Sequence, residues 1–287
     1  MRLIVLGSGS SGNALYIESG ATGVLVDTGL SAKETARRMT EVGLDPTRLS
    51  AIVVTHEHAD HVKGVRVMSK TANVPVFISD ATRRECPFPG EGEGIRWGQA
   101  ISSSQSFQIG SLDFHPFTIP HDGIDTFAFT VQSEGVKVAV VTDLGYITQL
   151  VAEHLRGSDF IMIEANHDRD MLKVGPYPWP LKQRIASSTG HLSNDEMARW
   201  IREDFDGRAQ YLVLAHLSRQ CNHPELARLC AIQALETHGS LFYPDADRRV
   251  KVAYHDRPSE WFELRIGFRI VRDLEQASRA NFARLIF

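Results

Sequence analysis

The segment Thr55-His56-Glu57-His58-Ala59-Asp60-His61 directly follows an apolar run at 51–54 that predicts a buried strand. His56 and His58 are two residues apart, so their side chains point the same way if the segment is extended. Asp60 and His61 fall where the chain is predicted to turn into a helix that runs to about residue 70, so they can face a second point nearby. Imidazole and carboxylate groups are ligands for Zn²⁺, Mn²⁺ or Fe. The segment therefore predicts a metal site rather than a solvated polar loop.

Three more potential ligands stand beside predicted strands elsewhere in the chain. His121 lies in a loop just before a strand, Asp143 ends the apolar run at 138–142, and His216 ends the run at 211–215. Taken alone, a histidine after a strand is more often structural, and an aspartate there is often a turn former. Together with residues 56–61 they complete two coordination shells.

These motifs, in this order and joined by Asp27 in VLVDTG, resemble those of the metallo-β-lactamase superfamily. The resemblance implies an α/β (α+β) fold, a four-layered αββα sandwich of two mixed sheets flanked by helices, with two divalent metal ions (Zn²⁺ or Mn²⁺) at one edge. It also implies the roles of the site residues. One metal ion is bound by His56, His58 and His121, the other by Asp60, His61 and His216; Asp143 bridges them, and Asp27 orients the ligand loops.

Further segments resemble one branch of the superfamily. An aspartate at 143, in place of cysteine, argues against a true β-lactamase, and the chain is too short for the inserted domain of the RNA-processing nucleases. Between residue 1 and about residue 265 it is similar to the YycJ/WalJ-like branch, on the segments EANHD (164–168), GPYP (175–178), LKQRI (181–185), GHLSN (190–194) and LAHLSR (214–219). That resemblance implies a 5′→3′ exonuclease that cleaves DNA with a hydroxide activated by two metal ions.

Residues near these segments are candidates for catalysis and DNA binding. His191 stands beside a predicted helix N-terminus, where backbone N–H groups favour a phosphate, and we expect it to act on the leaving group or the phosphate, with Asp60 and Asp143 as the other catalytic residues. Four side chains are candidates to hold the DNA, the alternative for each being a structural histidine or a solvated surface charge: His167, Lys182, Arg184 and Arg219.

The composition narrows the class of protein. The chain has 287 residues, 43% hydrophobic and 23% charged, with a net charge of −4, so it is not a polycation that coats nucleic acid. No apolar run approaches ~20 residues, so no membrane association is expected. The three cysteines form no CxxC pair, which favours a reducing cytoplasm.

The remaining patterns predict local structure. The glycines at 7, 9 and 12 match GxGxxG, but no helix follows, so we expect a strand-to-strand turn and not a nucleotide site. Capping boxes predict helices at Ser31–Glu34, Ser193–Glu196 and Asn222–Glu225, and a hairpin is expected at 127–142. We interpret residues 1–287 as one domain, with a possible extra helix at 266–287.

Other functions use the same ligands. A thioester or lactone hydrolase of the glyoxalase II type is one alternative, although residues 240–265 predict strand and loop in place of a helical substrate domain. A phosphodiesterase for small, cyclic substrates is another, and a non-enzymatic module with an empty site is a third. The sequence does not decide which metal ion is bound, whether the substrate is DNA or RNA, or how many copies of the chain associate.

Overall fold

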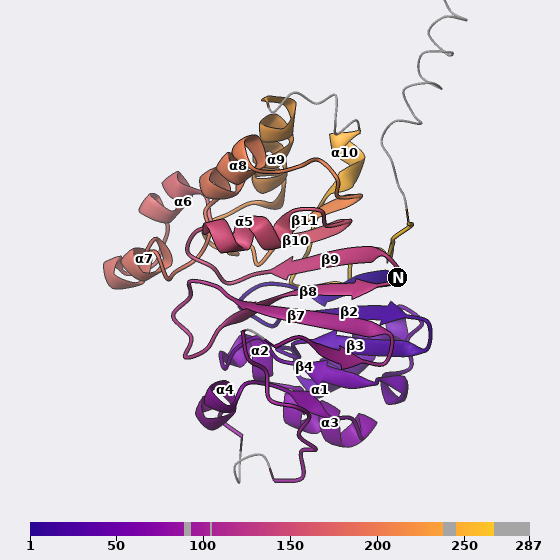
Figure 1. Cartoon of the computed structure of the whole chain (residues 1–287). Helices are drawn as coiled ribbons and strands as arrows, with labels where there is room; N and C mark the ends of the chain where they lie inside the picture. Colours follow the sequence, from indigo (N-terminus) through magenta and orange to yellow (C-terminus); the bar gives the residue numbers. More distant parts are fainter. Residues whose placement is uncertain (89–92, 104, 238–244, 267–287) are drawn as a thin grey trace, which may run out of the picture.

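Two β-sheets lie face to face between two layers of helices in the computed structural model (Figure 1). The structure describes residues 1–88, 93–103, 105–237 and 245–266. The four layers confirm the predicted αββα sandwich. The predicted helix at 266–287 lies, apart from its first residue, outside the described residues.

The first sheet has six strands. In spatial order they are β13 (Phe262–Glu263), β1 (Arg2–Gly7), β2 (Ala14–Ser19), β3 (Thr22–Val26), β4 (Ala51–Val53) and β5 (Val76–Phe77). The helices on its side of the molecule are α1 (Ala32–Glu41), α2 (Ala59–Val62), α3 (Val65–Ala72) and α4 (Asp80–Glu85), with a 3₁₀ turn at Pro46–Arg48.

The second sheet has seven strands. In spatial order they are β12 (Val250–Val252), β11 (Tyr211–Ala215), β10 (Phe160–Glu164), β9 (Val136–Val141), β8 (Phe127–Ser133), β7 (Leu112–Thr118) and β6 (Phe107–Ile109). The helices on its side are α5 (Gln149–Leu155), α6 (Arg169–Val174), α7 (Trp179–Ile185), α8 (Asn194–Glu203), α9 (Pro224–Thr237) and α10 (Ala246–Arg249).

Strands such as β3, β4 and β10 bury both of their faces because successive side chains alternate between two cores. In β9, Val138 and Val140 belong to the core between the sheets, whereas Ala139 and Val141 belong to the core under the helices. Residues Leu3–Leu6 of β1 divide in the same way between the inter-sheet core and the core under α1 and α3. This double burial explains why the strands appear in the sequence as unbroken apolar runs.

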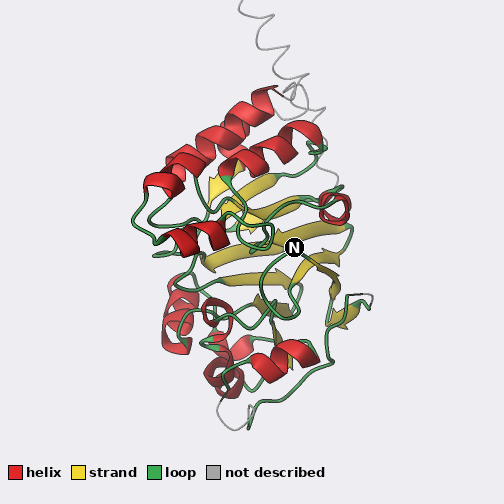
Figure 2. Cartoon of the chain, turned by 90° about the vertical axis from the view of Figure 1, so that its left-hand side faces the viewer, coloured by secondary structure: helices red, strands yellow, loops and turns green. Residues whose placement is uncertain are grey.

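The strand directions bring several loops to one edge. Strands β3 and β4 are parallel, as are β9, β10 and β11. β7 runs in the same direction as β9, because both pair antiparallel with β8. The segments that follow these strands therefore meet at the carboxyl edge of the sandwich, on the side that faces the viewer in Figure 2.

One local prediction is confirmed and one needs correction. The helix expected after residues 55–61, to about residue 70, is α3, and the separate short helix α2 precedes it. The two are divided at Gly64, whose N–H donates to the carbonyl oxygen of Thr28 and where a Cβ would lie 2.3 Å from the carbonyl oxygen of Leu30.

Asn222 does not form a capping box: its Oδ1 accepts from the side chain of Asn194 on α8, while the N–H of Glu225 donates to Nδ1 of His223. A tertiary contact overrides the local pattern there.

The other local predictions hold. β1 and β2 are antiparallel across the glycine-rich turn, β8 and β9 form the hairpin, and Ser31 and Ser193 cap α1 and α8. No helix among the described residues combines the length and apolarity needed to cross a bilayer.

Candidate metal centre

The seven predicted ligand side chains lie together at the carboxyl edge. They follow β4, β7, β9 and β11, and they are His56, His58, Asp60, His61, His121, Asp143 and His216. All seven are buried or partly buried, which places a dense set of nitrogen and oxygen donors at one point near the surface.

Three imidazoles form the first group. Nε2 of His56 lies 3.1 Å from Nδ1 of His58, and Nε2 of His121 lies 3.2 Å from the same Nδ1. His56 is fully buried, and burial holds its pKa well below the ordinary value for histidine. A neutral ring has a lone pair to offer, so three nitrogen donors face one small volume.

A second group lies beside the first. Nε2 of His61 is 3.2 Å from Oδ2 of Asp143, and Nε2 of His216 is 3.4 Å from Oδ2 of Asp60. Oδ1 of Asp143 is 3.3 Å from Nδ1 of His216. Asp143 also groups with His56 of the first set, their ligand atoms and that of His61 lying within 4.8 Å of one another, so its carboxylate stands between the two groups.

The buried Asp143 carboxylate shows what the centre needs. Its Oδ2 is shielded from solvent and, beyond the 3.2 Å contact with Nε2 of His61, has no hydrogen-bond partner among the described residues. Leaving a buried charged oxygen unsatisfied costs about 1–3 kcal/mol or more. A cation would satisfy that oxygen, and nitrogen and oxygen donors in this mixture suit a divalent metal ion. The residues present thus fit the group that they were expected to bind.

The carboxylates of the second group set the protonation of the two histidines beside them. Burial opposes protonation of His61 and His216, but the adjacent carboxylates outweigh it and raise the pKa of both rings well above the ordinary value. Burial would raise the pKa of Asp60, but the hydrogen bond with His216 and the charge of His61 lower it to about 2. The protein thus compensates negative charge here with protonated rings, the role that a cation would otherwise fill.

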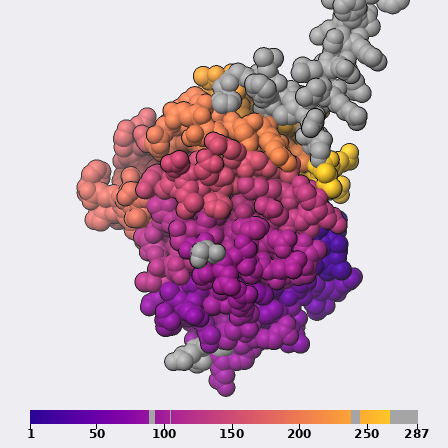
Figure 3. Space-filling view, in the orientation of Figure 1, coloured from indigo at the N-terminus to yellow at the C-terminus, as the bar shows by residue number. Residues whose placement is uncertain are grey.

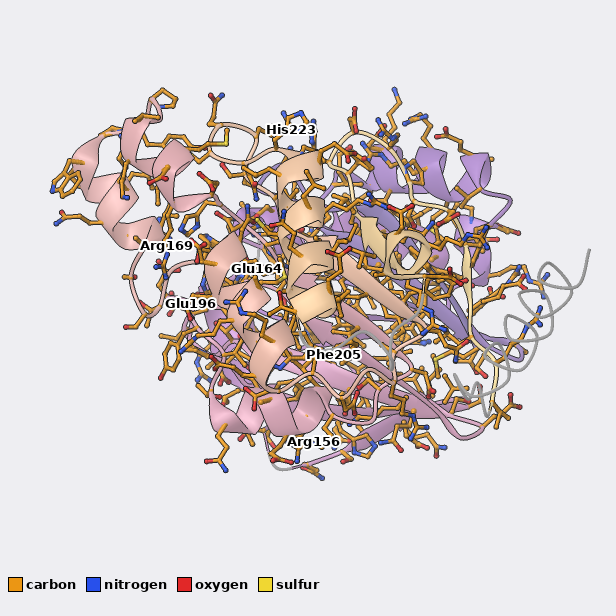
Figure 4. All side chains as sticks on the ribbon, turned by 90° about the horizontal axis from the view of Figure 1, so that it is seen from above. Arg156, Glu164, Arg169, Glu196, Phe205 and His223 are labelled. Atoms are coloured by element: carbon orange, nitrogen blue, oxygen red, sulfur yellow. The ribbon has the colours of Figure 1, made fainter. Side chains whose placement is uncertain are left out.

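Two residues of the centre received no role in the sequence interpretation. Glu164 is fully buried at the end of β10 (labelled in Figure 4) and its Oε1 lies 2.8 Å from Nδ1 of His216 and 2.9 Å from Nδ1 of His191. Asn13, in the turn after β1, places its Nδ2 3.0 Å from Nε2 of His61. Glu164 carries the same signal as Asp143, an acidic residue that ends an apolar run; Asn13 has no such signal.

Asp27 connects the centre to the backbone. Its Oδ1 accepts from the N–H of Thr55, and its Oδ2 lies 2.7 Å from Nδ1 of His61. Such a contact fixes the ring orientation and leaves Nε2 directed at the centre. This is the kind of contact expected of a residue that orients a ligand loop.

The backbone of the centre is unusual at three positions. Asp27, Asp143 and His216 have φ angles of 60°, 60° and 54°, in the left-handed region. Residues other than glycine enter this region at a cost of about 1–2 kcal/mol. Asp27 and His216 directly follow the last residues of β3 and β11, and Asp143 lies two residues past the end of β9, so a sharp turn after each strand aims these side chains inward.

The residues predicted to contact substrate are spread around the centre. His191 is stacked near His121 and His216, and Arg184 forms an ion pair with Asp122. Arg219 donates to Oγ of Ser11 at 2.8 Å. His167, just before α6, and Lys182, on α7, line a separate cavity beside these two helices.

A cavity of about 270 Å³ opens over the donors. Asp60, Asp143, His191 and His216 line it, and Arg184 stands at its wall. The donor atoms are therefore accessible to a small anionic group that approaches from solvent.

The chain is similar to known proteins over most of its length. Residues 22–217 match the family model described as the beta-lactamase superfamily domain. The exodeoxyribonuclease YycJ of Bacillus anthracis is 33% identical over 240 residues, which cover 82% of this chain and 89% of the relative. The chain belongs to the metallo-β-lactamase superfamily, in its YycJ/WalJ branch.

Two further comparisons agree with membership of this superfamily. The exodeoxyribonuclease WalJ of Streptococcus pneumoniae is 33% identical over 239 residues, covering 80% of this chain and 87% of the relative. The structure of the metallo-β-lactamase fold protein YhfI from Bacillus subtilis superposes with a TM-score of 0.67 at 17% identity, covering 91% of this chain and 100% of YhfI. The second similarity concerns the fold alone.

Proposed function

We propose that this chain is a phosphodiester hydrolase that removes nucleotides from DNA in the 5′→3′ direction with two divalent metal ions. The observation that carries the proposal is the 33% identity, over four fifths of the chain, to relatives named exodeoxyribonucleases. The convergence of seven donor side chains on one accessible point supports it.

The donors divide between two ions. His56, His58 and His121 would hold one ion, and Asp60, His61 and His216 the other. Asp143 would bridge them, since it lies in one group with His56 of the first set and His61 of the second, with their ligand atoms within 4.8 Å of one another. When bound, Zn²⁺ or Mn²⁺ supplies a water acidic enough to yield hydroxide near pH 7 and offsets the charge of the phosphodiester.

Three side chains of the protein would orient the reacting groups. Glu164 holds the Nδ1 atoms of His191 and His216, so the opposite nitrogen of each ring faces away from the carboxylate. His191 lines the 270 Å³ cavity and is partly exposed, which suits contact with the phosphate or the leaving 3′ oxygen. Asp60, also partly exposed at this cavity, orients the attacking water.

Binding of DNA would use the surroundings of the cavity. Arg219 lies at an exposed position beside the turn after β1. Arg184 also lines the cavity, and it would have to exchange its ion pair with Asp122 for a phosphate. Cations at such positions contact the phosphodiester backbone without reading sequence. The three cysteines, Cys86, Cys221 and Cys230, are all unpaired, in keeping with an enzyme of the reducing cytoplasm.

The test is cleavage of end-labelled DNA by the purified chain with added Mn²⁺ or Zn²⁺. Single- and double-stranded substrates with 5′-phosphate or 5′-hydroxyl ends are compared, and we expect mononucleotides to be released successively from the 5′ end. S-lactoylglutathione and a cyclic dinucleotide serve as alternative substrates. Turnover of either one without DNA cleavage would replace the proposed function.

A further inference from the structure

A second cavity, of about 520 Å³, lies beside the metal centre between α6, α7 and α8. His191 lines this cavity and the 270 Å³ cavity over the donors, so the two adjoin at that ring. The helices α6 and α7 that form its wall belong to a lobe that stands out from the side of the molecule in Figure 3. Its volume is that of a small-molecule site, about 300–1,000 Å³.

Aromatic side chains are exposed at this cavity. Trp179, the first residue of α7, is 67% exposed, and Tyr146 is 43% exposed. Both line the cavity, together with the apolar side chains of Leu172 and Ala186. Exposed aromatic rings beside a nuclease centre are surfaces on which nucleobases stack, at about 1–3 kcal/mol per base.

Two of the three cations that line the cavity among the described residues are paired with carboxylates. Arg169 is held by Glu196 at 2.8 Å, and these two residues are labelled near each other in Figure 4. Lys173 pairs with Asp170 at 2.7 Å, and such paired cations add little attraction for a phosphate. Nζ of Lys182 instead donates to the backbone oxygen of Lys173 at 2.6 Å. The cavity therefore suits a flat, uncharged base with at most one phosphate near Lys182.

One buried polar group at the cavity lacks a partner. His167 lines the cavity and is 2% exposed, and its Nδ1 has no hydrogen-bond partner in the part of the chain that the structure describes. Burial lowers the pKa of His167 to about 4, which leaves the ring neutral at pH 7. Buried polar groups are normally paired, so this ring marks a place for a ligand with its own donors and acceptors.

We propose that this cavity binds the 5′-terminal nucleoside of the DNA strand, with its base against Trp179 and Tyr146. The phosphodiester that joins this nucleoside to the next one then lies beside His191, over the metal ligands. The inference rests on the proposed exonuclease function and adds a subsite to it. It assigns the helical lobe of α6 and α7 the task of gripping the nucleotide that is removed.

The first test measures the preference for a terminal base. The full-length metal-loaded protein is given two DNA strands that differ only at the 5′-terminal residue, one normal and one abasic. We expect kcat/KM to be about 10-fold higher for the normal strand. Trp179→Ala reduces this ratio to near one, whereas Trp179→Phe, which keeps an aromatic face, retains most of it.

The matched control is Leu229→Ala. Leu229 is 49% exposed on α9 and does not line the cavity, so its truncation leaves the ratio unchanged. An equal kcat/KM for normal and abasic strands in the unmodified protein would overturn the subsite while leaving the exonuclease function intact. If the unmodified protein does not cleave DNA at all, the proposed exonuclease function itself is refuted.

A binding measurement gives a readout that does not depend on turnover. The probe is an oligonucleotide with 2-aminopurine at its 5′ end and a phosphorothioate at the first linkage, which slows cleavage. Stacking in the cavity quenches the 2-aminopurine fluorescence, and Trp179→Ala removes that quenching. Equal quenching in both proteins, or quenching only when the probe is placed internally, would contradict the assignment.

Discussion

Oε1 of Glu164 lies 2.8 Å from Nδ1 of His216. The same buried carboxylate contacts His191 and accepts from the backbone N–H of Leu144. A single side chain thus connects a predicted metal ligand to the residue predicted to face the phosphate. Metal-binding histidines commonly depend on such carboxylate partners for their orientation.

Replacement of Glu164 tests this dependence. Glu164→Gln keeps the size of the side chain but removes its charge, so we expect metal affinity to fall about 10- to 100-fold. Titration of the metal-free protein with Mn²⁺ or Zn²⁺ measures the change. Glu153→Gln, at an exposed position on α5, is the control and should bind metal normally; unchanged affinity in Glu164→Gln would refute the role.

Loss of Asp60 should abolish turnover. Asp60 is partly exposed, so Asp60→Ala leaves no large internal cavity and the fold stays intact. We expect kcat for DNA to fall by a factor on the order of 10³ or more, because an oriented attacking water is lost. The rate and the circular dichroism spectrum are measured together. Asp113→Ala, an exposed change on β7, is the control, and a folded Asp60→Ala protein with wild-type rates would end the proposed mechanism.

Metal ions should stabilise the fold. Because Asp143 is buried with an unsatisfied oxygen, ion binding to the folded chain satisfies a group that water reaches in the unfolded chain. At a free metal concentration 100 times Kd, the free energy of unfolding rises by about 2.7 kcal/mol. Urea denaturation with chelator or with Mn²⁺ measures the difference. In Asp143→Asn, most of this metal-dependent rise in unfolding free energy should be lost. If the urea denaturation curve of the unmodified protein is the same with chelator and with Mn²⁺, the chain does not bind the ion.

Gly29 should tolerate no side chain. A Cβ at this position would lie 1.5 Å from the carbonyl oxygen of Asp60, so Gly29→Ala must displace the loop that carries Asp60 and His61. We expect a loss of about 1–3 kcal/mol in unfolding free energy and a fall in DNA cleavage. Gly157→Ala is the comparison: it has open space around it but a φ of 73°, so it loses stability without losing activity. Normal activity in Gly29→Ala would show that the loop can yield.

Arg219 should contribute one backbone contact to DNA. Arg219→Gln removes an exposed charge beside Ser11, so binding weakens alike for all sequences. The slope of log K against log salt concentration should become shallower by about 0.7–0.9. Fluorescence anisotropy at several salt concentrations measures the slope. Arg156→Gln, next to Glu153 on α5, should leave it unchanged, and identical slopes for both variants would exclude the contact.

The sequence predicted the sandwich and the donor set because both depend on signals that are local in the chain. Strands buried on both faces leave unbroken apolar runs, and Asp143 and His216 stand beside the ends of such runs, with His121 in the loop between β7 and β8. Parallel strands then bring these ends to one edge. Nothing in that reasoning needs contacts between distant side chains.

Other features depend on tertiary contacts and could not be predicted in this way. Asn13 reaches His61 only because the turn after β1 packs against the histidine-rich segment, where its N–H donates to the carbonyl oxygen of Asp60. The division between α2 and α3 follows from the close approach of Gly64 to Leu30. The cavity beside α7 results from how three helices pack, and no periodicity in the sequence encodes it.

The short stretch from residue 250 to residue 263 has a consequence for assembly of the sandwich. It supplies the outer strand of both sheets, since β12 pairs with β11 and β13 pairs with β1. A nascent chain that has reached only residue 249 therefore presents two bare strand edges, one on each sheet, with unpaired N–H and C=O groups that invite association with other chains. Because one segment completes both of these edges, we expect its pairing to protect the folded chain from association there.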